Sequence, residues 1–139
     1  MADYHFYHPV EVFYGDLDPQ GHVNNARHLT YFEQARVRYL IELGLFSEDQ
    51  SFLEIGVILA DIQITYLAPI YFGQGIKVGV RTEKLGSKSM TVAQNVVDAA
   101  TGNELAKGKV VMVTYDYRAR KTIPIPEDWR KIISEFEHL

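Results

Sequence analysis

The 139-residue chain contains no cysteine. This absence excludes disulfide bonds, thiolate metal ligands and a cysteine nucleophile, and it agrees with a reducing cytoplasm.

The chain also lacks a clustered excess of basic residues, since its 14 lysines and arginines are outnumbered by 18 aspartates and glutamates. Nucleic-acid binding requires such a basic surface. We therefore expect no nucleic-acid partner.

No uninterrupted apolar stretch approaches the ~18 residues that a membrane-spanning helix needs. The first twelve residues, MADYHFYHPVEV, have neither the basic nor the apolar region of a secretory signal peptide. Repeats and low-complexity segments are absent as well. The sequence therefore predicts one globular domain over residues 1–139, located in the cytoplasm and without a membrane partner.

Strands are predicted where β-branched and aromatic residues gather or alternate with polar ones. The expected strands cover residues 6–14, 56–67, 75–85, 89–99 and 104–117. Short turns such as GSK and ATGN join the last three strands. Such short connections predict that neighbouring strands pair antiparallel.

Two helices are predicted from apolar residues that recur at spacings of three and four. The long helix covers residues 25–43, and Gly44 is expected to end it in a left-handed conformation. Its apolar face consists of Leu29, Phe32, Ala35, Tyr39, Leu40 and Leu43. A short helix is expected to begin near Pro126, and residues 47–54 are expected to form a helical turn. The apolar face of the short C-terminal helix consists of Trp129, Ile132, Ile133 and Phe136.

The long helix and the antiparallel sheet each present an apolar face, and these faces can bury each other. We therefore expect an α+β fold in which the sheet wraps around one long central helix. Strand 56–67 is nearly all apolar apart from Asp61 and Gln63, so its second face or edge needs a cover. A second copy of the chain would provide it. This predicts a homodimer or a homotetramer built as a dimer of dimers, with strand 56–67 at or near the interface.

The segment GDLDPQGHVNNARHLTYFEQAR, residues 15–36, concentrates polar side chains ahead of the long helix. DPQG suits a β-turn, and Asn24 or Asn25 suits the helix N-cap. One N-cap does not require two aspartates and a histidine as well. Free N–H groups at a helix N-terminus can stabilise an oxyanion, and a nearby carboxylate can attack a carbonyl or activate water. The segment therefore indicates chemistry at a carbonyl group.

The stretch DLDPQGHVNNARHLTYFEQAR resembles the signature of the hotdog-fold thioesterases related to 4-hydroxybenzoyl-CoA thioesterase, and EKLGSKSMT and PIPEDWR are similar too. The resemblance implies a hotdog fold and hydrolysis of an acyl-CoA thioester to the free acid and coenzyme A. It implies that Asp18 is the catalytic carboxylate, as nucleophile or general base, and that the backbone N–H of Asn25 is the oxyanion donor. His22 and Asn24 match a polar pair expected to support water or the thioester. His28 stands where the family commonly has tyrosine.

Two basic turns are candidates for binding the phosphates of coenzyme A, which need cations. The candidates are Lys84, Ser87 and Lys88 in the first turn, and Arg118 and Arg120 in the second. Coenzyme A is part of the substrate in this interpretation, and no separate cofactor is implied.

Other polar and aromatic residues near the motif carry weaker signals. Tyr31 lies off the apolar helix face, which makes it a candidate to line the substrate pocket. Asp16, Asp18 and His22 match none of the compact zinc-binding patterns, so we expect no metal site.

Two alternative functions fit the same residues. The first is an acyl carrier protein thioesterase, because HVNN also occurs in plant enzymes of that kind; the net charge of -4 disfavours docking of an acidic carrier protein. The second is a non-catalytic hotdog protein that binds acyl thioesters, although such a protein would not need Asp18. A serine hydrolase is disfavoured because no GxSxG surrounds any serine.

Overall fold

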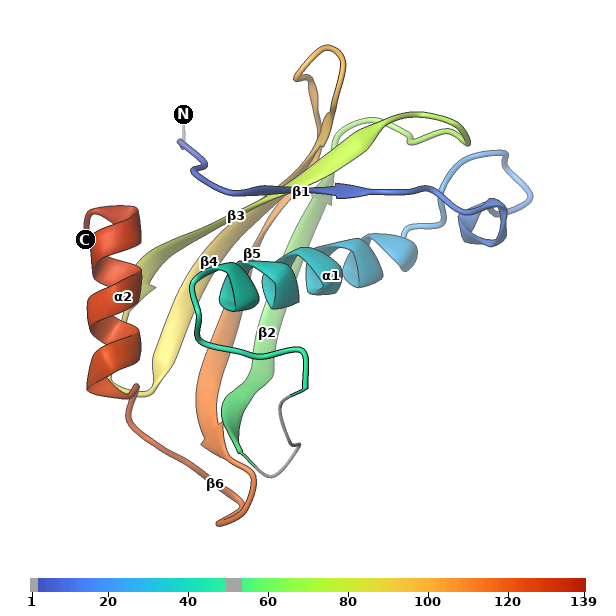
Figure 1. Ribbon diagram of the computed structural model, residues 1–139. Coiled ribbons are helices and arrows are strands. Elements are labelled where there is room, and N and C mark those ends of the chain that lie inside the picture. The colour runs from blue at the N-terminus through green and yellow to red at the C-terminus, as the bar shows by residue number, and fades with distance from the viewer. Residues whose placement is uncertain (1–2, 50–53) are drawn as a thin grey trace.

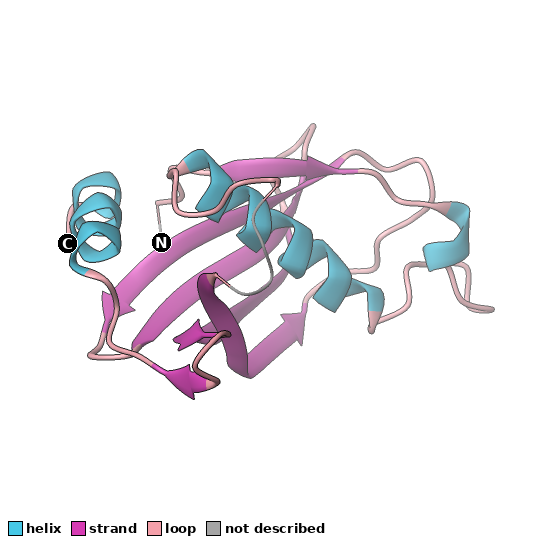
Figure 2. Cartoon of the chain, turned by 60° about the horizontal axis from the view of Figure 1, so that its bottom comes forward, coloured by secondary structure: helices cyan, strands magenta, loops and turns pink. Residues whose placement is uncertain are grey.

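The computed structural model describes residues 3–49 and 54–139, which form an antiparallel sheet and two α-helices (Figures 1 and 2). In chain order the elements are β1 (Tyr7–Val10), the 3-10 helix η1 (Tyr14–Asp16), α1 (Arg27–Glu42), β2 (Ile55–Tyr66), β3 (Ile76–Leu85), β4 (Ser89–Asp98), β5 (Glu104–Asp116), β6 (Lys121–Thr122) and α2 (Glu127–Glu137). The sheet curves around α1, and α2 packs beside β3 (Figure 1). The predicted α+β architecture is confirmed.

The strands follow the order β1-β3-β4-β5-β2, every neighbouring pair is antiparallel, and β6 pairs with β5. Each long strand, β2 to β5, lies within one residue of its predicted bounds. The first strand is shorter than predicted because η1 follows it, closed by a hydrogen bond of 3.0 Å from the Phe13 N–H to Asp16 Oδ2. β6 was not predicted, since two residues carry no readable pattern.

Helix α1 is shorter than the predicted span of residues 25–43. The Asn24 Oδ1 accepts the N–H of Ala26 at 2.9 Å, and the Asn24 carbonyl accepts the N–H of Arg27 at 2.9 Å. Asn24 therefore caps a tight first turn, and the regular helix begins only at Arg27. At the other end Gly44 has φ of 79°, and the N–H of Leu45 reaches back to the Leu40 carbonyl, which confirms the predicted termination.

The buried face of α1 is rotated relative to the predicted apolar stripe. Leu29 was expected in the core but is 43% exposed. The helix instead buries His28, Tyr31, Phe32, Ala35, Arg36, Tyr39 and Leu40. This face includes polar groups that need partners: Arg36 donates to Gln94 Oε1 at 3.2 Å, and burial lowers the pKa of its guanidinium. The orientation follows the sheet, which contacts α1 chiefly through β1 and β3.

Helix α2 begins after Pro126, as predicted, and buries Trp129 and Ile133. Its buried Glu137 joins three elements, because Oε2 accepts the Tyr39 hydroxyl at 2.5 Å and the Thr82 N–H at 2.8 Å. Of the predicted helical turn at residues 47–54, residues 48 and 49 lie in a turn, and residues 50–53 fall outside the described residues.

Strand β2 forms one edge of the sheet and pairs only with β5 among the described strands (Figure 1). Its register shifts between Leu59 and Asp61, and the exposed large apolar residues of this region are Ile58, Leu59, Tyr66 and Leu67. In a single copy of the chain, the outer edge of β2 is therefore uncovered, although the sequence predicts a cover for this strand. None of the helices in the described ranges is long and apolar enough to cross a membrane.

Candidate active site

The motif loop, which we define as residues 15–26, is held in one conformation by backbone hydrogen bonds. The Gly21 N–H donates to the Asp18 carbonyl at 2.9 Å, and Gly21 has φ of 86°, so the predicted turn at DPQG is present. The Asp18 N–H donates to the His22 carbonyl, and the Val23 N–H donates to the Ile70 carbonyl at 2.8 Å. The loop is thereby fixed both to itself and to the segment after β2.

The carboxylate of Asp18 is half-buried and accepts two hydrogen bonds. Oδ1 accepts the Gln20 N–H at 2.9 Å, and Oδ2 accepts the Asn24 Nδ2 at 3.4 Å. The oxygen of the same Asn24 side chain accepts the N–H of Ala26, the residue just before α1. Asn24 therefore orients the carboxylate relative to the helix N-terminus, which is the supporting position that the resemblance implies.

Asn25 lies between this capping residue and the helix. Its N–H has no hydrogen-bond acceptor among the residues that the structure describes, whereas its carbonyl accepts the Tyr66 hydroxyl at 2.9 Å. The Tyr66 side chain, at the end of β2, thus anchors the peptide group next to the free N–H of Asn25. An N–H that is free and fixed at a helix N-terminus has the geometry of an oxyanion donor.

Asp16 differs from Asp18 in its surroundings. It is buried, and its Oδ2 accepts the Tyr31 hydroxyl at 2.8 Å and the Phe13 N–H at 3.0 Å. Arg27 lies 3.8 Å from its other oxygen. Burial and the bond to Asp16 raise the pKa of the Tyr31 phenol, which is 2% exposed and lies beneath the loop. Both side chains are engaged in holding the loop on α1.

A cavity of about 300 Å³ opens at the start of α1, and we call it the helix-start cavity. Its lining residues are His22, Val23, Asn25, His28, Tyr66, Leu67, Ala68 and Pro69. The ring of His28 packs edge-on against that of Tyr66, with the ring centres 4.8 Å apart. Burial lowers the pKa of His28 to about 4, so its imidazole is uncharged at neutral pH.

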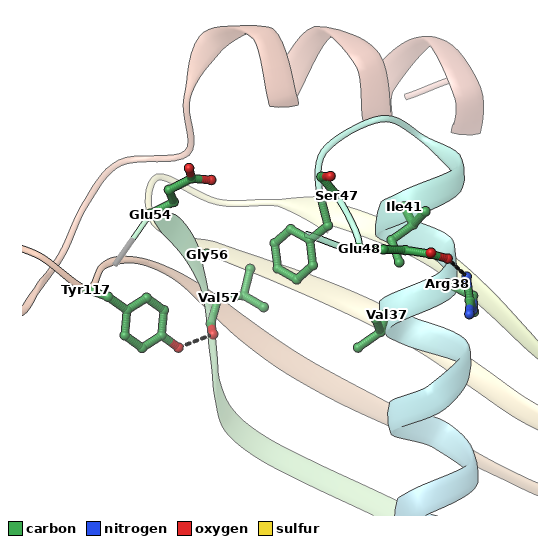
Figure 3. A pocket seen from close by; sticks show the side chains of 10 residues that line it. Val37, Arg38, Ile41, Ser47, Glu48, Glu54, Gly56, Val57 and Tyr117 are labelled. Atoms are coloured by element: carbon green, nitrogen blue, oxygen red, sulfur yellow. Dashed lines mark hydrogen bonds and ion pairs between the residues drawn. The ribbon is translucent and has the colours of Figure 1, made fainter. Parts of the chain in front are cut away.

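A second cavity of about 630 Å³, the β2-start cavity, lies between the C-terminal half of α1 and the first residues of β2 (Figure 3). Val37, Ile41 and Val57 give it apolar walls, and the Tyr117 hydroxyl donates to the Val57 carbonyl at 2.6 Å across its rim. The cavity and the motif loop therefore lie at opposite ends of α1.

The candidate phosphate-binding residues are also far from the motif loop within one copy of the chain. Lys84, Ser87 and Lys88 lie at the β3–β4 turn, and Arg118 and Arg120 lie after β5. β5 ends opposite Ile55, whereas the motif loop contacts Tyr66, eleven residues farther along β2. At about 3.3 Å per residue this is roughly 36 Å. One copy does not bring these cations and Asp18 together.

Within residues 3–49 and 54–139, no group of three or more histidine, aspartate or glutamate side chains is arranged to hold a metal ion. Asp16 and Asp18 point into different hydrogen-bond networks, as described above.

Residues 12–133 match the sequence profile of the thioesterase-like superfamily. The chain is a member of this superfamily. The thioesterase is 26% identical to the acyl-CoA thioesterase YbgC of Haemophilus influenzae, in an alignment covering 100% of this chain and 99% of that protein. Its structure is similar to that of a thioesterase from Thermus thermophilus complexed with coenzyme A and Zn, with 34% identity and a TM-score of 0.84. The match covers 100% of this chain and 99% of that one.

The PA5185 protein of Pseudomonas aeruginosa has a TM-score of 0.87 to this thioesterase, with 27% identity and coverage of 96% of this chain and 92% of that one. The resemblance to hotdog-fold thioesterases, predicted from the motif, is confirmed at the level of family, fold and enzyme class.

The sequence did not predict the part of the site that comes from the end of β2. Tyr66 anchors Asn25, and residues 67–69 form a wall of the helix-start cavity. Nothing in the spacing of the motif points to these residues, because their position depends on sheet register rather than on local sequence.

Proposed function

We propose that this thioesterase hydrolyses acyl-CoA thioesters to the free acid and coenzyme A, with Asp18 as the catalytic carboxylate. One observation carries the proposal: the Asn24 side chain bonds both the half-buried Asp18 carboxylate and the N–H of Ala26, which is next to the unpaired N–H of Asn25. The comparison with YbgC supports the substrate class.

In the proposed reaction the thioester carbonyl oxygen accepts the N–H of Asn25. Asp18 then attacks the carbonyl carbon, or it removes a proton from a water molecule that attacks instead. Either route forms a new C–O bond and an oxyanion, which collapses by breaking the C–S bond and releasing the thiolate of coenzyme A. In the nucleophilic route, water then hydrolyses the acyl-aspartate. In the general-base route, the proton that Asp18 has taken from water passes to the departing thiolate. A single oxyanion donor is typically worth about 3–4 kcal/mol. His22 and Asn24 position the water and the carboxylate.

A homodimer paired through β2 would complete this site. Two copies of one edge strand related by a two-fold axis pair antiparallel. This pairing brings the Ile55 end of one β2 beside the Tyr66 end of the other. The β2-start cavity of one copy then extends the helix-start cavity of the second. The turn bearing Arg118 and Arg120 approaches the same site, whereas the β3–β4 turn lies farther from this edge.

The proposal is tested by following thiol release from short-chain, long-chain and aromatic acyl-CoAs with a thiol-reactive dye. We expect Asp18→Asn to lower kcat by roughly 10² or more on the best substrate, the usual scale for a positioned base. His22→Ala and Asn24→Ala should have smaller effects. Asp128→Asn, at an exposed aspartate of α2, serves as the matched control.

Near-normal turnover by Asp18→Asn would contradict the catalytic assignment and favour a non-catalytic protein that binds acyl thioesters. Hydrolysis of acyl carrier protein thioesters, with acyl-CoAs left intact, would replace the proposed substrate class.

A further inference from the structure

The imidazole of His28 is a polar group in the helix-start cavity that the proposed reaction does not use. His28 lines this cavity, yet the residue is only 3% exposed. Its Nδ1 is buried and has no hydrogen-bond partner among the described residues. A buried polar atom without a partner is costly, so its retention in a cavity wall calls for an explanation.

The surroundings keep His28 uncharged. Burial is the cause that lowers its pKa, and its ring neighbours are the aromatic rings of Tyr31 and Tyr66. An uncharged imidazole carries one proton, on either Nδ1 or Nε2. A proton on the enclosed Nδ1 would be a buried donor without an acceptor. In the Nε2–H form Nδ1 remains unpaired, as an acceptor, and the N–H lies on the ring nitrogen that is not enclosed.

The position of His28 relates this donor to the proposed oxyanion site. The His28 N–H bonds to the Asn25 carbonyl, so the two residues are one turn apart at the start of α1. Both residues line the helix-start cavity, so an acyl group whose thioester carbonyl accepts the Asn25 N–H has its first carbons in the cavity that His28 also lines.

The remaining walls limit what that group can be. Val23, Leu67, Ala68 and Pro69 supply apolar surface, and the polar lining residues other than His28 are His22, Asn25 and the Tyr66 hydroxyl. The Tyr66 hydroxyl is already bonded to Asn25. A cavity of this composition suits an apolar chain with one hydrogen-bond acceptor close to its thioester.

We propose that His28 is a specificity-determining residue whose imidazole donates a hydrogen bond to an oxygen substituent on the β-carbon of the acyl group, so that 3-oxoacyl or 3-hydroxyacyl thioesters are preferred over saturated ones. This inference rests on the proposed acyl-CoA hydrolysis and deepens it by naming the substrate class.

The test compares saturated, 3-hydroxyacyl and 3-oxoacyl-CoA of the same chain length. We expect the wild-type enzyme to have the higher kcat/KM on an oxygenated chain. His28→Phe keeps a ring but removes the donor, so it should reduce that preference by roughly 3- to 10-fold, the scale of one neutral hydrogen bond. His28→Gln restores a donor and should recover part of the preference. His8→Phe, on β1 and outside the cavity, should leave the ratio unchanged.

A binding measurement separates this inference from the proposed function. Calorimetry with the Asp18→Asn variant compares the Kd values of the same three compounds, with and without His28→Phe. Equal affinities, or a Kd ratio that His28→Phe does not alter, would overturn the role of His28. If the wild-type protein hydrolyses none of the acyl-CoAs but the Kd values differ and His28→Phe abolishes that difference, the result would support the role of His28 and count against the proposed hydrolysis alone.

Discussion

The hydroxyl of Tyr66, the last residue of β2, donates a hydrogen bond of 2.9 Å to the carbonyl oxygen of Asn25, ahead of the first regular turn of α1. The two residues are 41 positions apart in the sequence. The bond connects the edge strand of the sheet to the peptide next to the proposed oxyanion donor. The site therefore depends on the position of β2 as well as on the motif loop.

Tyr66→Phe removes this bond and keeps the aromatic ring against His28. Because the peptide before the helix loses its anchor, we expect kcat to fall roughly fivefold, close to the value of one hydrogen bond, with a small change in stability. Steady-state kinetics measures the effect. Tyr71→Phe, an exposed tyrosine in the following loop, is the control. A kcat equal to that of the control would show that the loop is held without the hydroxyl.

Asp16→Asn should act on stability. Its carboxylate accepts the hydroxyl of the buried Tyr31 and the Phe13 N–H, so an amide in its place disturbs a buried network. We expect the free energy of unfolding in urea to fall by about 1–3 kcal/mol. Asp18→Asn, which changes a half-buried carboxylate, should lower the same quantity by less. An equal loss in both variants would contradict the separate roles of the two aspartates.

Burial of His28 makes the stability of the folded state depend on pH. Its pKa is about 4 in the folded chain, against about 6.5 for an unfolded histidine. Its contribution is fully present above pH 6.5 and is lost as the pH falls toward 4, because the unfolded chain then binds the extra proton. The unfolding free energy of the wild type, relative to His28→Phe, should therefore fall by up to about 1.4 kcal/mol per pH unit in this window. Urea titrations at several pH values test this, and a constant difference would contradict a neutral buried His28.

The exposed edge of β2 predicts self-association. Light scattering at micromolar concentration should give two or four times the 15.9 kDa of one chain. Leu59→Asp places a charge on the edge strand and should shift the mass toward that of a single chain. Leu139→Asp, at another exposed leucine, is the control. A wild-type mass near 15.9 kDa would end this prediction.

The two basic turns make different predictions for the KM of acyl-CoA. If β2 pairs as proposed, Arg118→Gln with Arg120→Asn should raise KM about tenfold and leave kcat largely intact, as loss of uniform binding does. Asparagine is chosen because Arg120 has φ of 57°. Lys84→Gln with Lys88→Gln should change KM less. A KM that neither pair alters would exclude both turns from the phosphate site.

The sequence predicted those features that depend on neighbouring residues. Apolar runs, alternation and short turns defined β2 to β5, and the turn at Asn24 and the stop at Gly44 are local as well. The exposed Leu29 was misplaced because a helix with apolar residues on several sides is oriented by the sheet, which its own sequence does not describe.

The same distinction holds within the site. Asp18, Asn24 and Asn25 lie in one short motif and were recognised together. Tyr66 and the burial of His28 depend on the register of β2 against β5, which no local pattern reports. The local sequence carried no information on the long-range pairing of β2 with β5.

The bond between Tyr39 and Glu137 has a consequence for the order of folding. The residues are 98 positions apart, and the same carboxylate also holds the Thr82 N–H of β3. Closing so long a loop is entropically unfavourable before other contacts have formed. We therefore expect α2 to dock in a late step, after the sheet has enclosed α1, so that hydrogen-exchange protection of the Thr82 amide develops later than that of the β4–β5 hairpin.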